Sequence, residues 1–294
     1  VKIELNKEII DVEQKKKIIS IMEIKNLNNK DMAYGNFLLA RYEQQKKNFE
    51  KEFNFLLKGH SYYYKWGKKK YDQGVNYWLN TISNNQELMD LGKSDNAAKG
   101  QITPIFIVGV PRCGSTLIEK VIASGKNKIS IGEETAILSF FVGKKIVAND
   151  LFKNNISKFK DEIIEKYKNR GLIKKENNYI FTDKSLDNFF FIGLIKEIFP
   201  NAKVINCKRN PLASIMSILK NNLGDVSWAH DLNHILKFFD TYHNKINSFK
   251  KIHPNFIYEV ELEKFVENPE TESKKLMRFC NLTWDKSCLE FYKR

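Results

Sequence analysis

The sequence has 294 residues, of which 42% are hydrophobic and 29% charged, and its formal net charge is +14. This length accommodates one α/β domain of about 200 residues plus a smaller companion. The composition excludes extended disorder. The sequence has no apolar run of about 18 residues, so we expect no membrane span. The first twenty residues are charged throughout, and no secretory signal is readable in them. We therefore expect a cytoplasmic protein, provisionally, because the chain begins with Val1 rather than Met.

The positive charge is spread along the whole chain and favours anionic partners in general. An anionic cosubstrate or an acidic acceptor would fit this charge, and so would a lysine-rich surface that reflects only codon bias. No nucleic-acid-binding motif with its own spacing occurs, so we expect no nucleic-acid partner. The four cysteines have no metal-ligand spacing, which predicts reduced thiols and no bound metal.

Residues 1–98 are predicted to be helical. Apolar residues recur there at spacings of three, four and seven, which is typical of an amphipathic helix pair: Phe37, Leu38, Tyr42, Phe49, Phe53, Leu56 and Leu57. Part of this region resembles one degenerate tetratricopeptide repeat, with Glu52 and Gly59 at positions where alanine is expected. A helical region of this kind is a candidate surface for a protein partner.

Residues 99–294 are predicted to form a second domain of the doubly wound α/β class. A short unbroken apolar run, typical of a buried parallel strand, occurs at Ile105–Val108. Similar runs follow at Tyr179–Thr182, Lys203–Cys207 and Phe256–Val260. Helical patterns separate them at about 116–124, 134–146, 188–199, 211–222 and 230–250. Alternation of strands and helices predicts a parallel sheet flanked by helices.

The most informative motif is the loop 109–116, Gly-Val-Pro-Arg-Cys-Gly-Ser-Thr, which joins a buried strand directly to a helix. The N–H groups at a helix start lack intrahelical partners and carry partial positive charge, so they bind phosphate-like anions. In ATP-binding loops of this spacing a lysine occupies the position of Ser115. The sequence therefore favours an anion other than ATP, with a nucleotide kinase as one alternative.

The segment PRCGSTL at 111–117 resembles the P-R-S-G-T-T-L loop of sulfotransferases that use 3′-phosphoadenosine-5′-phosphosulfate. Within that family the chain is similar to the tetratricopeptide-linked bacterial group and the tyrosylprotein sulfotransferases. The resemblance assigns the 5′-phosphosulfate to six loop residues, which are Arg112, Cys113, Gly114, Ser115, Thr116 and Leu117. Cys113 stands where serine is usual, which weakens one side-chain donor and leaves the backbone cradle unchanged.

A second motif, Gly-Glu-Glu-Thr at 132–135, is placed at the start of a predicted helix. Tyrosylprotein sulfotransferases have the same four residues, and the resemblance makes Glu134 the general base that removes the acceptor's proton. Those enzymes place an arginine where this chain has Ala136. The acceptor is therefore predicted only as a free hydroxyl on a peptide, a sugar or a small molecule.

Two further strand ends complete the predicted site. Lys184 follows the second predicted strand, where the family's lysine counters charge on the leaving phosphate oxygen. Arg209 follows the third strand, with Ser217 eight residues later, and the resemblance assigns both to the 3′-phosphate. The predicted reaction is in-line sulfuryl transfer that releases 3′,5′-bisphosphoadenosine without a metal.

The resemblance covers about residues 100–290, and family members generally continue beyond the equivalent of Arg294. We therefore expect the transferase domain to be truncated at its C-terminus. This feature, together with Cys113 and Ala136, keeps a second alternative open, a helical-repeat interaction protein with a degenerate transferase domain.

Overall fold

The structure is a computed structural model that describes residues 9–93, 102–148, 150, 155–174 and 179–293. The chain forms two compact units. One comprises Val1–Ile82 and Ile215–Phe239, and the other comprises Ser83–Ser214 and Asp240–Arg294. The predicted domain boundary at residue 98 lies outside the described residues.

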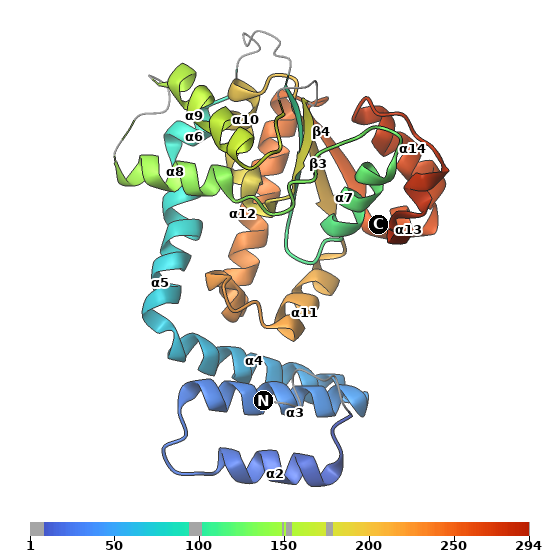
Figure 1. The fold of residues 1–294 in the computed structure, drawn as a ribbon. Helices are drawn as coiled ribbons and strands as arrows, with labels where there is room; N and C mark the ends of the chain where they lie inside the picture. Colours follow the sequence, from blue (N-terminus) through green and yellow to red (C-terminus); the bar gives the residue numbers. More distant parts are fainter. Residues whose placement is uncertain (1–8, 94–101, 149, 151–154, 175–178, 294) are drawn as a thin grey trace. The chain divides into compact units, whose positions relative to one another are not determined.

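The regular elements of the first unit are all helices in its described residues, which confirms the predicted N-terminal helical segment (Figure 1). Besides parts of α11 (Pro211–Asn221) and α12 (Leu232–Ile252), they are α2 (Val12–Met22), α3 (Asn29–Gln45), α4 (Phe49–Trp66), α5 (Lys68–Asn76), the π-helix η1 (Tyr77–Ile82) and the 3-10 helix η3 (Ser227–His230). The side chains of Asn28 and Asn48 accept hydrogen bonds from the first turns of α3 and α4, as N-cap residues do. The resemblance of this segment to a tetratricopeptide repeat stays a prediction.

Buried aromatic rings form part of the core of the first unit. Tyr63 and Tyr71 pack with Ala33, and the His230 ring lies 4.8 Å and 4.7 Å from these two tyrosine rings. Gly59 is required by close packing, because a Cβ there would lie 2.5 Å from the Phe37 ring. The first unit therefore has its own packed core.

The second unit is built on a four-stranded parallel sheet of strand order β2-β1-β3-β4. The strands are β1 (Thr103–Gly109), β2 (Ile180–Asp183), β3 (Lys203–Lys208) and β4 (Ile257–Glu261). Each overlaps a run that predicted it. Most residues of β1, β2 and β3 are buried, which favours apolar side chains, whereas β4 at the edge of the sheet is only partly buried. This arrangement confirms the predicted fold class.

Helices cover both faces of this sheet (Figure 1). One group comprises α7 (Ser115–Ser124), α13 (Leu262–Glu267) and α14 (Pro269–Phe279), and the other comprises α8 (Ile137–Val147), α9 (Ile156–Asn169) and α10 (Ile192–Ile198). The remaining elements are α6 (Gln86–Asp90), α11 (Pro211–Asn221), α12 (Leu232–Ile252) and the 3-10 helices η2 (Leu186–Phe191), η4 (Lys286–Leu289) and η5 (Phe291–Lys293). No helix in the described part of the chain is long and apolar enough to cross a membrane.

The strand order determines where a ligand crevice forms. The connection after β1 leads to β2 on one side, whereas β3 lies on the other side of β1 and leads outward to β4. In open parallel sheets, ligands bind beyond the carboxyl ends of the strands at such a switch point. The loop after β1 and the residues after β3 lie at the carboxyl ends of the two strands that flank this switch point.

Three predicted helices differ from the observed elements. The helix expected from residue 134 begins at Ile137, so Glu134 lies in the preceding loop rather than in a helix. The helix expected over 188–199 starts as the 3-10 helix η2, and the one expected from residue 230 starts at Leu232. Helix α9 was not predicted, although Phe159, Ile163 and Tyr167 recur every four residues and are buried.

Candidate active site

The loop between β1 and α7 has a backbone that requires glycine at one position. Gly114 has φ of 90°, and a Cβ there would lie 2.6 Å from Leu262 Cδ1. Arg112 also has a positive φ, of 71°. Because Gly114 is the N-cap residue and has no side chain, the cradle that the loop offers to an anion is built from backbone N–H groups at the helix start.

The side chains of the loop differ in their exposure. Arg112 and Thr116 are exposed, Leu117 is half-buried and Ser115 is buried. Cys113 is 1% exposed, and a hydrogen bond from the buried Cys207 thiol lowers the pKa of the Cys113 thiol. The Cys113 side chain therefore lies beneath the loop, and its backbone is the part that faces a ligand.

The predicted 3′-phosphate arginine lies next to the loop. Arg209 Nη1 donates to the carbonyl oxygen of Arg112 over 3.0 Å, which joins the end of β3 to the loop after β1. The following residue, Asn210, accepts from the Ala213 backbone N–H and so caps α11. Ser217 lies further along α11, in the part of this helix that belongs to the first unit.

Glu134 and Lys184, which are separated by fifty positions in the chain, form an ion pair. Lys184 Nζ lies 3.2 Å from Glu134 Oε1. The Lys184 side chain is 7% exposed, whereas that of Glu134 is 72% exposed. The pair therefore combines a fixed cation with a carboxylate that solvent reaches.

The backbone holds this pair in place. Ser130 forms a parallel bridge to Phe181, which extends the pairing at the edge of β2. A Cβ on Gly132 would collide with the Thr182 carbonyl oxygen, so the close approach of the two segments requires glycine. The Lys184 N–H then donates to the Glu133 carbonyl oxygen over 2.7 Å. This backbone pairing brings Glu134 to the end of β2.

Two residues beside Glu134 adopt left-handed backbone conformations. Glu133 has φ of 51° and Ala136 has φ of 52°. For residues other than glycine this conformation costs about 1–2 kcal/mol, and it concentrates at functional sites. The loop that presents Glu134 is thus held in one shape by its surroundings.

Glu119 is a member of the site that sequence reasoning missed. Its side chain is 4% exposed and its Oε2 lies 3.9 Å from Lys184 Nζ. The other oxygen accepts from the Thr182 hydroxyl over 2.7 Å and from the Glu133 N–H over 3.2 Å. Burial raises the pKa of the Glu119 carboxyl, while Thr182 and Lys184 oppose the rise. Glu119 positions Lys184 from beneath.

A second buried carboxylate organises the other side of this loop. Asp183 Oδ2 accepts from the Thr135 hydroxyl over 2.7 Å and from the Tyr167 hydroxyl over 2.6 Å, and its Oδ1 accepts from the Ser185 N–H. Burial raises the pKa of Tyr167, so its hydroxyl stays protonated and donates. Asp183 therefore fixes the end of α9 and the residue after Glu134 to the end of β2.

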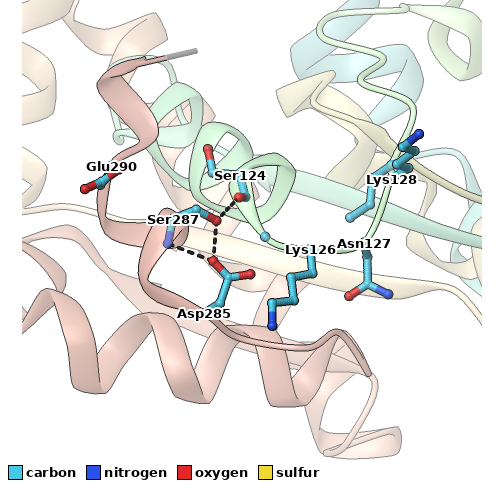
Figure 2. A pocket seen from close by; sticks show the side chains of 9 residues that line it. Ser124, Lys126, Asn127, Lys128, Asp285, Ser287 and Glu290 are labelled. Carbon is cyan, nitrogen blue, oxygen red and sulfur yellow. Dashed lines mark hydrogen bonds between the residues drawn. The ribbon is translucent and has the colours of Figure 1, made fainter.

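One cavity of the second unit lies away from this site. It has a volume of about 490 Å³ and is lined by residues at the end of α7 and by the segment around η4. There the Ser287 hydroxyl contacts the Ser124 carbonyl oxygen and the Asp285 carboxylate (Figure 2). At 1.5 Å per residue, α7 places Ser124 about 14 Å from the anion-binding loop. These contacts secure the segment around η4 to α7.

Among the described residues, no group of three or more His, Cys, Asp and Glu side chains has the arrangement of a metal site. The four cysteines are free and buried.

The fold and the site define a class of protein. It is an α/β protein with two features at the carboxyl ends of its strands, an anion-binding loop between a strand and a helix and an ion pair of a lysine with a carboxylate. A sequence model of the sulfotransferase family matches residues 104–286, more than half of the chain. The chain belongs to the sulfotransferase family.

Two curated relatives are similar over much of the chain. An uncharacterised protein of Aquifex aeolicus is 26% identical in an alignment of length 283, which covers 89% of this chain and 36% of that protein. Protein-tyrosine sulfotransferase A of Caenorhabditis elegans is 25% identical in an alignment of length 219, which covers 67% of this chain and 54% of that protein. The chain thus spans about a third and about half of the length of these relatives.

Solved structures with a similar fold include two sulfotransferases. The sulfotransferase domain of the Synechococcus PCC 7002 olefin synthase aligns with a TM-score of 0.48 and 17% identity, covering 69% of this chain and 81% of that chain. A sulfotransferase of Mycobacterium tuberculosis aligns with a TM-score of 0.42 and 11% identity, covering 98% and 94%.

Proposed function

We propose that this chain transfers a sulfuryl group from 3′-phosphoadenosine-5′-phosphosulfate to an acceptor hydroxyl and releases 3′,5′-bisphosphoadenosine. Membership of the sulfotransferase family supports sulfuryl transfer in general. The observation that supports the finer proposal is the ion pair of Glu134 and Lys184. The ion pair brings a candidate proton acceptor and a candidate countercharge together after the carboxyl end of β2. The anion-binding loop begins at the carboxyl end of the neighbouring strand β1.

In this proposal the donor is bound at two places. The backbone at Arg112–Leu117 binds the 5′-phosphosulfate, since the start of α7 lacks a side-chain cap and Gly114 leaves the backbone accessible. Arg209 binds the 3′-phosphate, because a guanidinium donates two parallel hydrogen bonds to phosphate. Ser217 is proposed as a second 3′-phosphate ligand from its place in the motif alone.

The proposed reaction is an in-line displacement at sulfur. The acceptor oxygen forms a bond to sulfur as the bond from sulfur to the bridging phosphate oxygen breaks, and the electron pair stays on that oxygen. Glu134 accepts the hydroxyl proton, and Lys184 balances the charge on the leaving oxygen. A phosphosulfate near Lys184 competes with Glu134 for the ammonium group, which releases the carboxylate to act as a base.

The proposal involves no metal, and the acceptor is defined only by its free hydroxyl. A protein partner for the helical unit and a cytoplasmic location stay predictions from the sequence. The rival assignment, a nucleotide kinase, is disfavoured by Ser115, which stands where an ATP-binding loop has its lysine.

A calorimetric titration tests the donor assignment. We expect 3′,5′-bisphosphoadenosine to bind at least about tenfold more tightly than adenosine 5′-monophosphate, since the 3′-phosphate adds a charged hydrogen bond. We also expect it to bind more tightly than ATP with magnesium. Tighter binding of ATP with magnesium would overturn the proposal in favour of a kinase.

A further inference from the structure

A second cavity of the sulfotransferase unit adjoins the loop that carries the proposed base. It has a volume of about 530 Å³ and opens next to Thr135. Its remaining lining residues come from the start of α8 and the end of α9, namely Ala136, Ile137, Phe140, Lys166, Asn169 and Arg170. Thr135 follows Glu134 in the chain, so their Cα atoms are about 3.8 Å apart. This cavity, which we call the α9 pocket, therefore borders the loop from which the Glu134 side chain extends.

The two walls of the α9 pocket differ in chemistry. The wall from α8 is apolar, and its Phe140 side chain is 63% exposed although it is large and hydrophobic. The wall from α9 has the two cations Lys166 and Arg170, which lie four residues apart and so on one helix face. Among the described lining residues there is no carboxylate to neutralise them.

Arg170 is held at the pocket edge with most of its hydrogen-bonding capacity unused. Its Nη2 donates to the Thr135 carbonyl oxygen over 3.5 Å. Tyr167, one turn earlier, anchors this end of α9 through its bond to Asp183. A guanidinium has five N–H donors, and that of Arg170 donates no second hydrogen bond within the described part of the chain. The remaining donors suit a carboxylate, which a guanidinium binds through two parallel bonds.

We propose that the α9 pocket is the acceptor site, and that it selects hydroxyl acceptors with an apolar body and a carboxylate, which Arg170 and Lys166 bind. The apolar body lies against Ile137 and Phe140 while the hydroxyl faces Glu134. This inference rests on the proposed function for the identity of the hydroxyl substrate. The binding of the carboxylate follows from the pocket itself.

A matched pair of probes tests the proposal, 3-(4-hydroxyphenyl)propionate and its primary amide, which differ only in charge at one end. Calorimetry on the full chain with saturating 3′,5′-bisphosphoadenosine gives the affinity for each. We expect the carboxylate to bind about tenfold more tightly than the amide, the effect of one charged hydrogen-bonded pair. Arg170→Gln and Lys166→Gln should each reduce this preference, and the double variant should abolish it.

Two further variants separate a pocket effect from a general one. Lys168→Gln removes a cation from the same helix, but Lys168 pairs with Glu165 and does not line the pocket, so the preference should persist. Phe140→Ala should weaken both probes alike. In turnover, Arg170→Gln should raise KM for the carboxylate more than KM for the amide.

The outcomes distinguish this inference from the proposed function. Equal affinity for the two probes, no binding of either, or a preference that survives the double variant would overturn the acceptor site. Tight, Arg170-dependent binding of the carboxylate without sulfuryl transfer would instead retain the anion-binding pocket and refute the proposed function.

Discussion

Lys184 and Glu134 form an ion pair in which the cation is buried and the carboxylate is open to solvent. The ammonium nitrogen and Glu134 Oε1 are 3.2 Å apart, with side-chain exposures of 7% and 72%. The buried Glu119 holds the lysine from the other side. In the proposed reaction Lys184 is the fixed countercharge and Glu134 the accessible base.

Replacement of Lys184 should affect both stability and turnover. Lys184→Met leaves the Glu119 carboxylate buried without its cation, which should lower the free energy of unfolding by about 1–3 kcal/mol. The same variant should lower kcat because the leaving oxygen loses its countercharge. Urea denaturation and steady-state kinetics measure the two effects.

A double variant separates the two roles. Lys184→Met combined with Glu119→Gln removes the cation together with the buried charge that needs it, so most of the stability should return. Turnover should stay low. Recovery of turnover in the double variant would show that Lys184 has only a structural role.

Arg209 should discriminate the 3′-phosphate. Arg209→Gln is expected to weaken binding of 3′,5′-bisphosphoadenosine about tenfold or more, through loss of a charged hydrogen bond. Binding of adenosine 5′-monophosphate should change little, because that ligand lacks the 3′-phosphate. Calorimetry with both ligands measures this difference, and an equal loss for the two would contradict the assignment.

The parallel sheet could be predicted because its signals are local. Each strand coincides with a short, mainly apolar run, and the glycine loop at 109–116 follows one of them. The start of α8 could not be predicted in the same way. Thr135 turns away to Asp183, which lies far along the chain, and Ala136 adopts a left-handed conformation before the helix begins. Tertiary contacts, not local preference, determine that boundary.

The motifs around Glu134 and Lys184 predict that these two are site residues, but no motif in the sequence identifies Glu119 or Arg170. Glu119 is one charged residue of an amphipathic helix, and its burial depends on Thr182 in another element. Arg170 is the C-cap residue of α9, a helix that the sequence analysis does not predict. Residues that act through distant partners leave little local signal.

The helical unit should lose stability in mild acid because of two buried histidines. His60 Nε2 contacts the Leu219 carbonyl oxygen over 2.8 Å, so it donates, and its Nδ1 then accepts from His230 Nδ1, 3.0 Å away. Burial lowers the pKa of His60 to about 4 and that of His230 to about 3. The folded unit therefore keeps both rings neutral in mild acid.

The unfolded chain takes up protons near pH 6.5, well above the pKa of either folded histidine. Between about pH 6.5 and pH 4 the unfolded state binds more protons, so stability falls as pH falls. Each histidine contributes on the order of 3 kcal/mol to this loss. The difference in unfolding free energy between the wild type and His60→Asn should shrink from pH 7.5 to pH 5. A difference that is independent of pH would contradict the assignment.

The proposed reaction depends on Glu134 to remove the proton from the acceptor hydroxyl. A comparison of Glu134→Gln with Glu133→Gln, a neighbouring exposed carboxylate, tests this role by release of 3′,5′-bisphosphoadenosine from the phosphosulfate donor in the presence of a phenolic acceptor. We expect Glu134→Gln to lower kcat by about 10²–10⁴-fold with unchanged affinity for the bisphosphate, and Glu133→Gln to retain turnover. Wild-type turnover in Glu134→Gln would refute the role of Glu134 as the base.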